Sequence, residues 1–137
     1  MSFRLAGLLR LRRLEEDRAA GALAVANAER RRADERRTAT AGRIAASSLD
    51  DGDFSAAVAG RAALFGAYAE STAYLAIAQQ RAAEAGSTWT DARRSVRMLD
   101  KLAERHAASE EAEQLRAEQL LLDETATRQA LTTEGER

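Results

Sequence analysis

A heptad repeat that runs for about forty residues in the second half of the chain constrains the fold most. Alternating steps of four and three residues meet apolar side chains throughout, except at Ser71 and His106. A 3.5-residue period keeps one stripe of side chains facing a partner helix, so the repeat predicts a coiled coil. We call these positions the heptad seam: Leu64, Tyr68, Ser71, Leu75, Ala78, Ala82, Ala85, Trp89, Ala92, Val96, Leu99, Ala103 and His106.

The composition favours an all-α fold. Alanine, arginine, glutamate and leucine dominate, proline is absent, and runs of strand-forming residues are missing. The 137 residues include only one Trp, two Tyr and three Phe, which is little bulk for a thick globular core. We therefore expect residues 1–137 to form a single elongated coiled-coil domain.

One short segment has the composition of a turn. Residues 47–53 gather Ser, Asp and Gly, and Asp51 or Asp53 is placed to cap a helix that starts at Phe54. A turn here predicts an antiparallel two-helix hairpin with a C-terminal helical overhang. The expected bounds are a helix over about 3–46, the turn at 47–53, a helix over about 54–132 and a frayed tail at 133–137.

Charge is distributed unevenly along a chain whose net charge is −1. Residues 1–46 hold eleven arginines and six acids, residues 47–90 two arginines and five acids, and residues 91–137 eight basic and eleven acidic groups. Arms of opposite charge attract each other when they fold back, so this pattern also favours the antiparallel hairpin.

The densest arginine cluster does not indicate a nucleic-acid site. Acidic residues Asp34 and Glu35 interrupt it and Glu29 precedes it, as on a solvated helix face. The aromatic residues in the second half of the chain are accompanied by only two arginines, Arg61 and Arg81, which argues against base stacking. We expect no nucleic-acid partner. The cluster comprises Arg30, Arg31, Arg32, Arg36 and Arg37.

A turn centred near residue 50 predicts the register, because paired positions in the two arms should then sum to about 100. Leu11 is expected opposite Trp89, and Leu14 near Ala82 and Ala85. The first arm carries a looser apolar stripe than the second. Its expected members are Leu11, Leu14, Val25 and Ala28.

In this register the first arm ends before the second, and everything beyond about Val96 lacks an intramolecular partner. That overhang is rich in leucine, and leucine that the chain cannot cover itself points to a binding partner. The alternative is a third helical segment that folds back near His106. The leucines concerned are Leu99, Leu102, Leu115, Leu120, Leu121 and Leu122, with Leu5, Leu8 and Leu9 in the facing N-terminal turns.

Residues suited to catalysis or metal binding are scarce. There is no cysteine, and the single histidine, His106, lies in the seam without a Glu-x-x-His partner motif. No phosphate-binding glycine loop or nucleophile elbow occurs, and the acid pairs alternate with basic residues as on solvated faces. We expect no enzyme activity, no catalytic residue, no cofactor and no metal site. No apolar run suits a signal peptide or a membrane span, so we expect a cytoplasmic protein.

Several segments, in their order and spacing, resemble the flagellar export protein FliJ family. They are Phe3-Arg4-Leu5, the run from Leu8 to Glu16, the break Asp51-Gly52-Asp53-Phe54, the run from Leu99 to His106, and Leu122-Asp123-Glu124-Thr125-Ala126. The resemblance covers the whole chain. The chain departs from the family pattern in being richer in alanine and in carrying Ser or Thr at positions such as Ser71, Thr72 and Ser87.

The resemblance implies a non-enzymatic part of the bacterial flagellar type III protein export apparatus. Such proteins bind the export ATPase ring and the export gate, help recycle export chaperones, and associate peripherally with the inner face of the membrane at the flagellar base. It implies that the ATPase contacts are Leu5, Leu8, Leu9, Leu102, Leu115 and Leu122. The candidate gate contacts are Phe65, Tyr68 and Tyr74.

Two other functions stay open at the level of sequence. One is a central-stalk rotor subunit of a rotary ATPase, although such subunits usually carry a globular insertion for which residues 47–53 leave no room. The other is a generic homodimeric coiled-coil scaffold in which the overhangs of two copies pair with each other.

Overall fold

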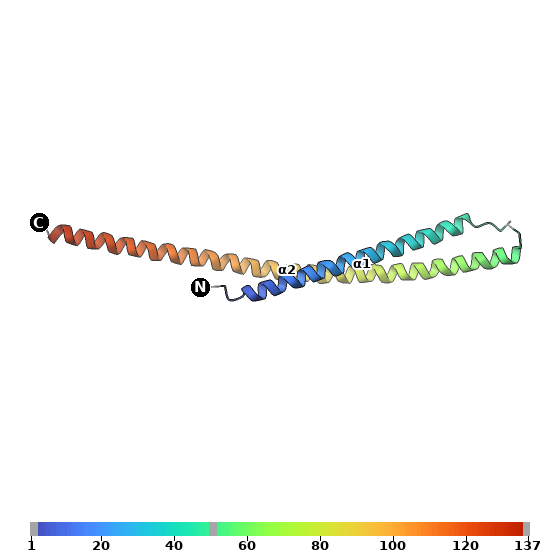
Figure 1. The fold of residues 1–137 in the computed structure, drawn as a ribbon, viewed down its shortest axis with the longest axis horizontal. Helices are drawn as coiled ribbons and strands as arrows, with labels where there is room; N and C mark the ends of the chain where they lie inside the picture. Colours follow the sequence, from blue (N-terminus) through green and yellow to red (C-terminus); the bar gives the residue numbers. More distant parts are fainter. Residues whose placement is uncertain (1–2, 50–51, 136–137) are drawn as a thin grey trace. The chain divides into compact units, whose positions relative to one another are not determined.

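The computed structural model describes residues 3–49 and 52–135, and the described residues form two helices. Helix α1 spans Ala6–Ala46 and helix α2 spans Phe54–Gly135 (Figure 1). The two helices pack against each other, which confirms the predicted all-α helical hairpin. The chain divides into two compact units, one of residues 1–12 with 95–137 and one of residues 13–94, and each is described separately.

Local hydrogen bonds explain where the helices end in the unit of residues 13–94. The Ser47 backbone N–H and hydroxyl both donate to the Ile44 carbonyl, at 3.2 and 2.7 Å, and close α1. The Asp53 carboxylate accepts a hydrogen bond from the Ser55 N–H at 3.0 Å and so caps α2. Between them Gly52 has a φ of 74°, a conformation that side chains disfavour. The alternative cap, Asp51, lies outside the described residues.

In this unit the helices meet along small side chains. Ala33 packs with Leu75 and Ala78 in one buried cluster. Farther along, a Cβ added at Gly86 would lie 3.8 Å from Leu23 Cδ1. The small residues Ala33, Ala78 and Gly86 let the two helix backbones approach closely.

The unit of residues 1–12 and 95–137 has a bulkier core. Leu9 of α1 packs with Val96 and Leu99 of α2 in a second buried cluster. Phe3 precedes α1, and its ring lies 5.5 Å from the imidazole of His106, centroid to centroid. His106 is therefore a packed residue of the hairpin.

All thirteen residues of the heptad seam are buried or half-buried, so the seam was predicted correctly. The apolar stripe proposed for α1 was wrong. Leu11, Leu14 and Val25 are exposed and only Ala28 is half-buried. The buried or half-buried residues that recur at heptad spacing in α1 are instead Leu9, Arg12, Glu16, Ala19, Leu23, Ala26, Ala33, Arg37, Thr40 and Ile44.

The predicted register was also wrong, because contacting positions sum to between 105 and 111 and not to 100. Helix α2 starts beyond the level at which α1 ends (Figure 1), so each residue of α1 faces a later position in α2 than a turn centred at residue 50 predicts. The proposed opposition of Leu11 and Trp89 is lost, and Leu14 does not pack with Ala82 or Ala85.

The new register moves the start of the overhang. Val96, Leu99 and His106 have partners in the hairpin, and every residue from 111 to 135 is exposed. We call residues 111–135 the tail segment. It continues α2 without a break to Gly135, so the described chain contains no third helix folded back near His106. The frayed tail expected at 133–137 stays a prediction, and its residues 136–137 lie outside the described residues. That residues 1–137 form one domain stays a prediction.

Candidate protein-docking surfaces

The tail segment presents apolar side chains that nothing in the described chain covers. Leu115 is 60% exposed and Leu122 is 65% exposed. Seven residues separate them, which is two helical turns or about 10 Å, so they share one face of α2. The uncharged residues at heptad spacing around them form what we call the tail stripe: Ala112, Leu115, Gln119, Leu122 and Ala126. Leu120, Leu121 and Leu131 are exposed on other faces of the same segment.

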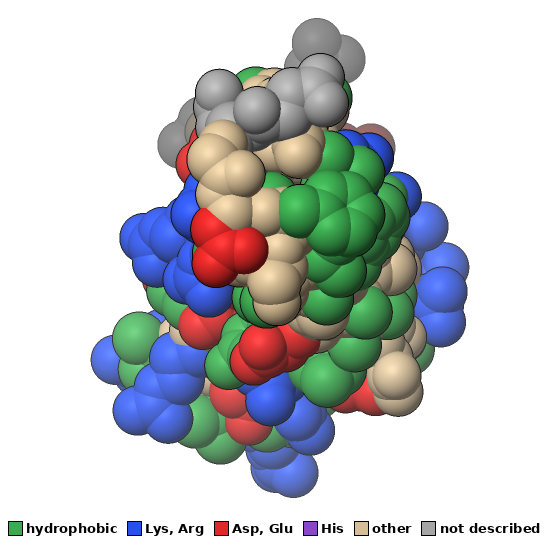
Figure 2. All heavy atoms as spheres, turned by 90° about the vertical axis from the view of Figure 1, so that its right-hand side faces the viewer, with side chains coloured by type: hydrophobic (Ala, Val, Ile, Leu, Met, Phe, Trp, Pro, Cys, Tyr) green, Lys and Arg blue, Asp and Glu red, His purple; other side chains and the backbone are tan. Residues whose placement is uncertain are grey.

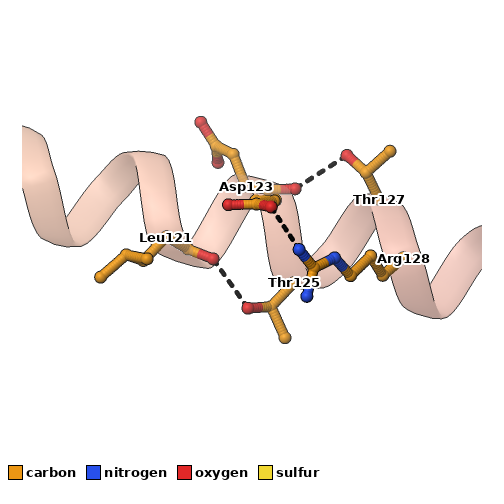
Figure 3. Close-up of polar contacts among 6 residues, drawn as sticks. Leu121, Asp123, Thr125, Thr127 and Arg128 are labelled. Carbon is orange, nitrogen blue, oxygen red and sulfur yellow. Dashed lines mark hydrogen bonds and ion pairs between the residues drawn. The ribbon is translucent and has the colours of Figure 1, made fainter.

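Polar side chains of the tail segment bond mostly to their own helix. The Thr125 hydroxyl donates to the Leu121 carbonyl at 2.7 Å, and the Thr127 hydroxyl donates to the Asp123 carbonyl at 2.8 Å (Figure 3). Arg128 pairs with Glu124 one turn earlier (Figure 3). These local bonds satisfy polar groups without tertiary contacts, and the leucines of the tail stripe stay uncovered.

The predicted ATPase contacts in the other half of this unit fall into two groups. Leu5, Leu8 and Leu102 are each 38% exposed, and the register places Leu5 level with Leu102. Leu9 differs, because it is 9% exposed and packs against Val96 and Leu99. Leu9 therefore holds the two helices together, whereas Leu5, Leu8 and Leu102 have surface to offer a partner.

The predicted gate contacts lie on the unit of residues 13–94. Phe65 and Tyr74 are exposed, and the Arg61 guanidinium lies over the Phe65 ring at 5.8 Å. Tyr68 is half-buried, and its hydroxyl accepts hydrogen bonds from Arg37 Nε at 3.3 Å and Nη2 at 3.2 Å. The structure does not bring the three into one patch, since Tyr68 belongs to the heptad seam.

An apolar patch near the connecting segment was not anticipated. Phe54 and Val58 are exposed in the first turns of α2, and Phe65 continues their face. Leu49, which precedes α2 in the sequence, is also exposed. Figure 2 shows apolar side chains gathered on one side of this end of the unit. The spacing of Phe54, Val58 and Phe65, with no acidic residue between Phe54 and Ala69, was the signal in the sequence.

A groove with a basic rim runs between α1 and α2 in the same unit. Two adjoining hollows of about 400 and 250 Å³ share Ala33, Arg36 and Tyr74 in their walls. We call this the arginine groove. Its charged and larger apolar lining residues are Arg32, Arg36, Arg43, Arg81, Glu29, Glu70, Tyr74 and Ile77. The sequence interpretation treated Arg32 and Arg36 as parts of a solvated face and missed that they border a groove with Tyr74.

None of these surfaces suggests a reaction. The described residues contain no group of three or more His, Asp or Glu side chains arranged for a metal ion. In the part of the chain that the structure describes, no helix is both long and apolar enough to cross a membrane. What the surfaces offer is exposed leucine, aromatic and arginine side chains on a helical scaffold, which are features of protein docking.

Comparison with known proteins identifies the family of the chain. No curated protein and no solved structure matches it significantly. The family model described as "Flagellar FliJ protein" matches residues 1–135 of the 137. That match spans both helices and the tail segment. The chain therefore belongs to the flagellar FliJ family of non-enzymatic proteins with a role in flagellar export.

Proposed function

We propose that this chain binds the flagellar export ATPase ring and the export gate, and that it assists export and chaperone recycling from the cytoplasmic face of the cell membrane. The tail segment is the main support for the proposed ATPase contact. Its 25 helical residues are all exposed, and its leucines Leu115 and Leu122 lie two turns apart. A helix with no tertiary packing is marginal by itself, and docking its apolar face would stabilise it.

For the ATPase contact we propose Leu115 and Leu122 of the tail stripe together with Leu5, Leu8 and Leu102. All five have exposed surface, and leucine on a helix face is the usual anchor in a groove or pore of a partner. Leu9 was predicted as an ATPase contact because of the resemblance to the FliJ family. Its packing against Val96 and Leu99 makes it a support for Leu5 and Leu8, so a change at Leu9 would loosen the hairpin as well as the surface.

The test of the ATPase contact mixes the purified chain with the export ATPase of the same organism and follows ring assembly and ATP hydrolysis. The native chain should stimulate hydrolysis, and a Leu115→Ala, Leu122→Ala variant should bind more weakly by about 2 kcal/mol or more, a roughly thirtyfold loss of affinity. The matched control is Leu11→Ala, Leu14→Ala, which removes two exposed leucines of α1 outside the proposed surface. Equal stimulation by both variants would refute the docking surface, and no stimulation by the native chain would refute the function.

For the gate we propose the aromatic residues of the other unit. Phe65 and Tyr74 expose their rings, whereas Tyr68 is tied to Arg37 and contributes by holding α1 and α2 in register. A Phe65→Ala, Tyr74→Ala variant should lose binding to the cytoplasmic domain of the export gate protein and keep ATPase stimulation. Val25→Ala is the control, since Val25 is equally exposed and lies outside this surface. Loss of gate binding by the Val25 variant, or its retention by the aromatic variant, would remove these residues from the contact.

A further inference from the structure

The arginine groove and the tail stripe are complementary in charge, apolar content and spacing. The groove carries four arginines and two glutamates at its border. The tail segment carries six acidic side chains and two arginines. From this match we propose that the tail segment of one copy of this chain docks in the arginine groove of a second copy.

The spacing of the charges supports one register. Arg36 and Arg43 both line the groove and lie seven residues apart on α1. Glu111 and Glu118 also lie seven residues apart and flank Leu115 on the edge of the tail stripe. With the tail antiparallel to α1, Glu111 meets Arg43 and Glu118 meets Arg36. Pairs of opposite charge at heptad spacing are the arrangement that sets partner and orientation in coiled coils.

The apolar side chains agree with the same register. Leu122 follows Glu118 by one turn and reaches the part of the groove where Tyr74 and Ile77 lie. Tyr74 is 57% exposed and Ile77 50% exposed, so both have surface to lose to a third helix. Leu115 meets the alanines Ala39 and Ala67, which leave space for it in the wider hollow.

A second copy can supply the occupant, because each copy carries both the arginine groove and the acidic tail segment. In self-association, Leu115 and Leu122 are covered by the groove, so they would be withheld from the export ATPase. That last consequence rests on the proposed function, whereas the self-association does not.

The first test uses charge reversal and mass in solution. Sedimentation equilibrium at low salt should show the native 14.8 kDa chain associating, and added salt should dissociate it, because the pairs are exposed. Arg36→Glu, Arg43→Glu should be monomeric alone, and so should Glu111→Arg, Glu118→Arg. An equimolar mixture of the two variants should associate again, since each reversed surface then meets its complement. A native chain that stays monomeric, or a mixture that does not associate, would overturn the proposal.

The second test locates the contact and uses the absence of cysteine from the chain. An Ile77→Cys chain mixed with a Leu122→Cys chain should form the mixed disulfide under mild oxidation. Ala76→Cys is the matched control, because Ala76 neighbours Ile77 in sequence and is exposed, yet does not line the groove. Equal cross-linking of Leu122→Cys to the Ala76→Cys chain, or preferential Leu122–Leu122 pairing, would place the tail elsewhere and refute docking in the groove.

Discussion

Helix α2 contains two regions that both carry apolar residues but differ in burial. Over residues 64–106, each heptad-seam residue is buried or half-buried, because α1 lies against it. Over the tail segment, residues 111–135, every residue is exposed. The paired region uses alanine at positions such as Ala78 and Ala82, whereas the tail displays leucine. The contrast teaches that burial here is set by the presence of a partner helix and not by the hydrophobicity of the segment.

The largest expected effect tests the paired region at its centre. Leu75 is buried with Ala33 and Ala78, so Leu75→Ala removes apolar contact and leaves a cavity. We expect the free energy of unfolding to fall by about 2–5 kcal/mol, measured by urea denaturation followed by circular dichroism. Leu131→Ala in the tail segment is the control and should change little. Similar losses for the two variants would show that the regions do not differ.

An overpacking change tests the close approach of the helices in the paired region. Ala33 is 4% exposed, the lowest value among the buried residues, and it faces Leu75. Ala33→Leu should push the helices apart and lower the free energy of unfolding by about 1–3 kcal/mol. Thermal denaturation measures this loss of stability. The control is Val25→Leu, which enlarges an exposed side chain of α1. Unchanged stability of Ala33→Leu would mean that the interface is looser than described.

A smaller effect is expected at the start of α2. The Asp53 carboxylate accepts the Ser55 N–H, and Asp53→Ala leaves that donor to water. We expect a loss of about 1 kcal/mol, and Asp53→Asn should retain most of the stability because its side-chain oxygen still accepts the bond. Denaturation midpoints of the two variants give the comparison. Equal losses for Ala and Asn would contradict the cap.

The smallest effect on stability should come from the tail. Leu122 is 65% exposed, so Leu122→Ala should change the free energy of unfolding by less than about 0.5 kcal/mol. The measurement is made at high salt, where the proposed self-association is dissociated. A loss above about 1 kcal/mol would show that the tail packs within the hairpin.

The sequence was sufficient to predict which residues of α2 lie in the interface between the helices, but not which residues of α1 do. The heptad seam is apolar enough to be recognised, and the Ser, Asp and Gly residues of 47–53 mark the turn. The interface residues of α1 were not recognised in the sequence because they include the charged residues Arg12, Glu16 and Arg37. Long charged side chains cover a seam with their apolar stems while their charged ends reach outward or find a partner, as Arg37 does at Tyr68.

The docking surfaces were predictable only where they depend on one helix. The leucines of the tail follow from the sequence of α2 alone. The arginine groove required the register of α1 against α2, because Arg36 and Tyr74 are 38 positions apart and meet across the hairpin. Composition does not determine that register. The same dependence explains why Leu9 was taken for a surface residue.

Hydrogen–deuterium exchange of the chain, alone and with the export ATPase, tests the central claim most directly. Alone and monomeric, the tail segment should exchange rapidly, while amides of α2 over residues 71–99 should be protected by their packing against α1. With the ATPase bound, we predict that residues 111–135 become protected and that residues 71–99 change little. A tail that exchanges equally fast with and without the ATPase would contradict its assignment as the docking surface.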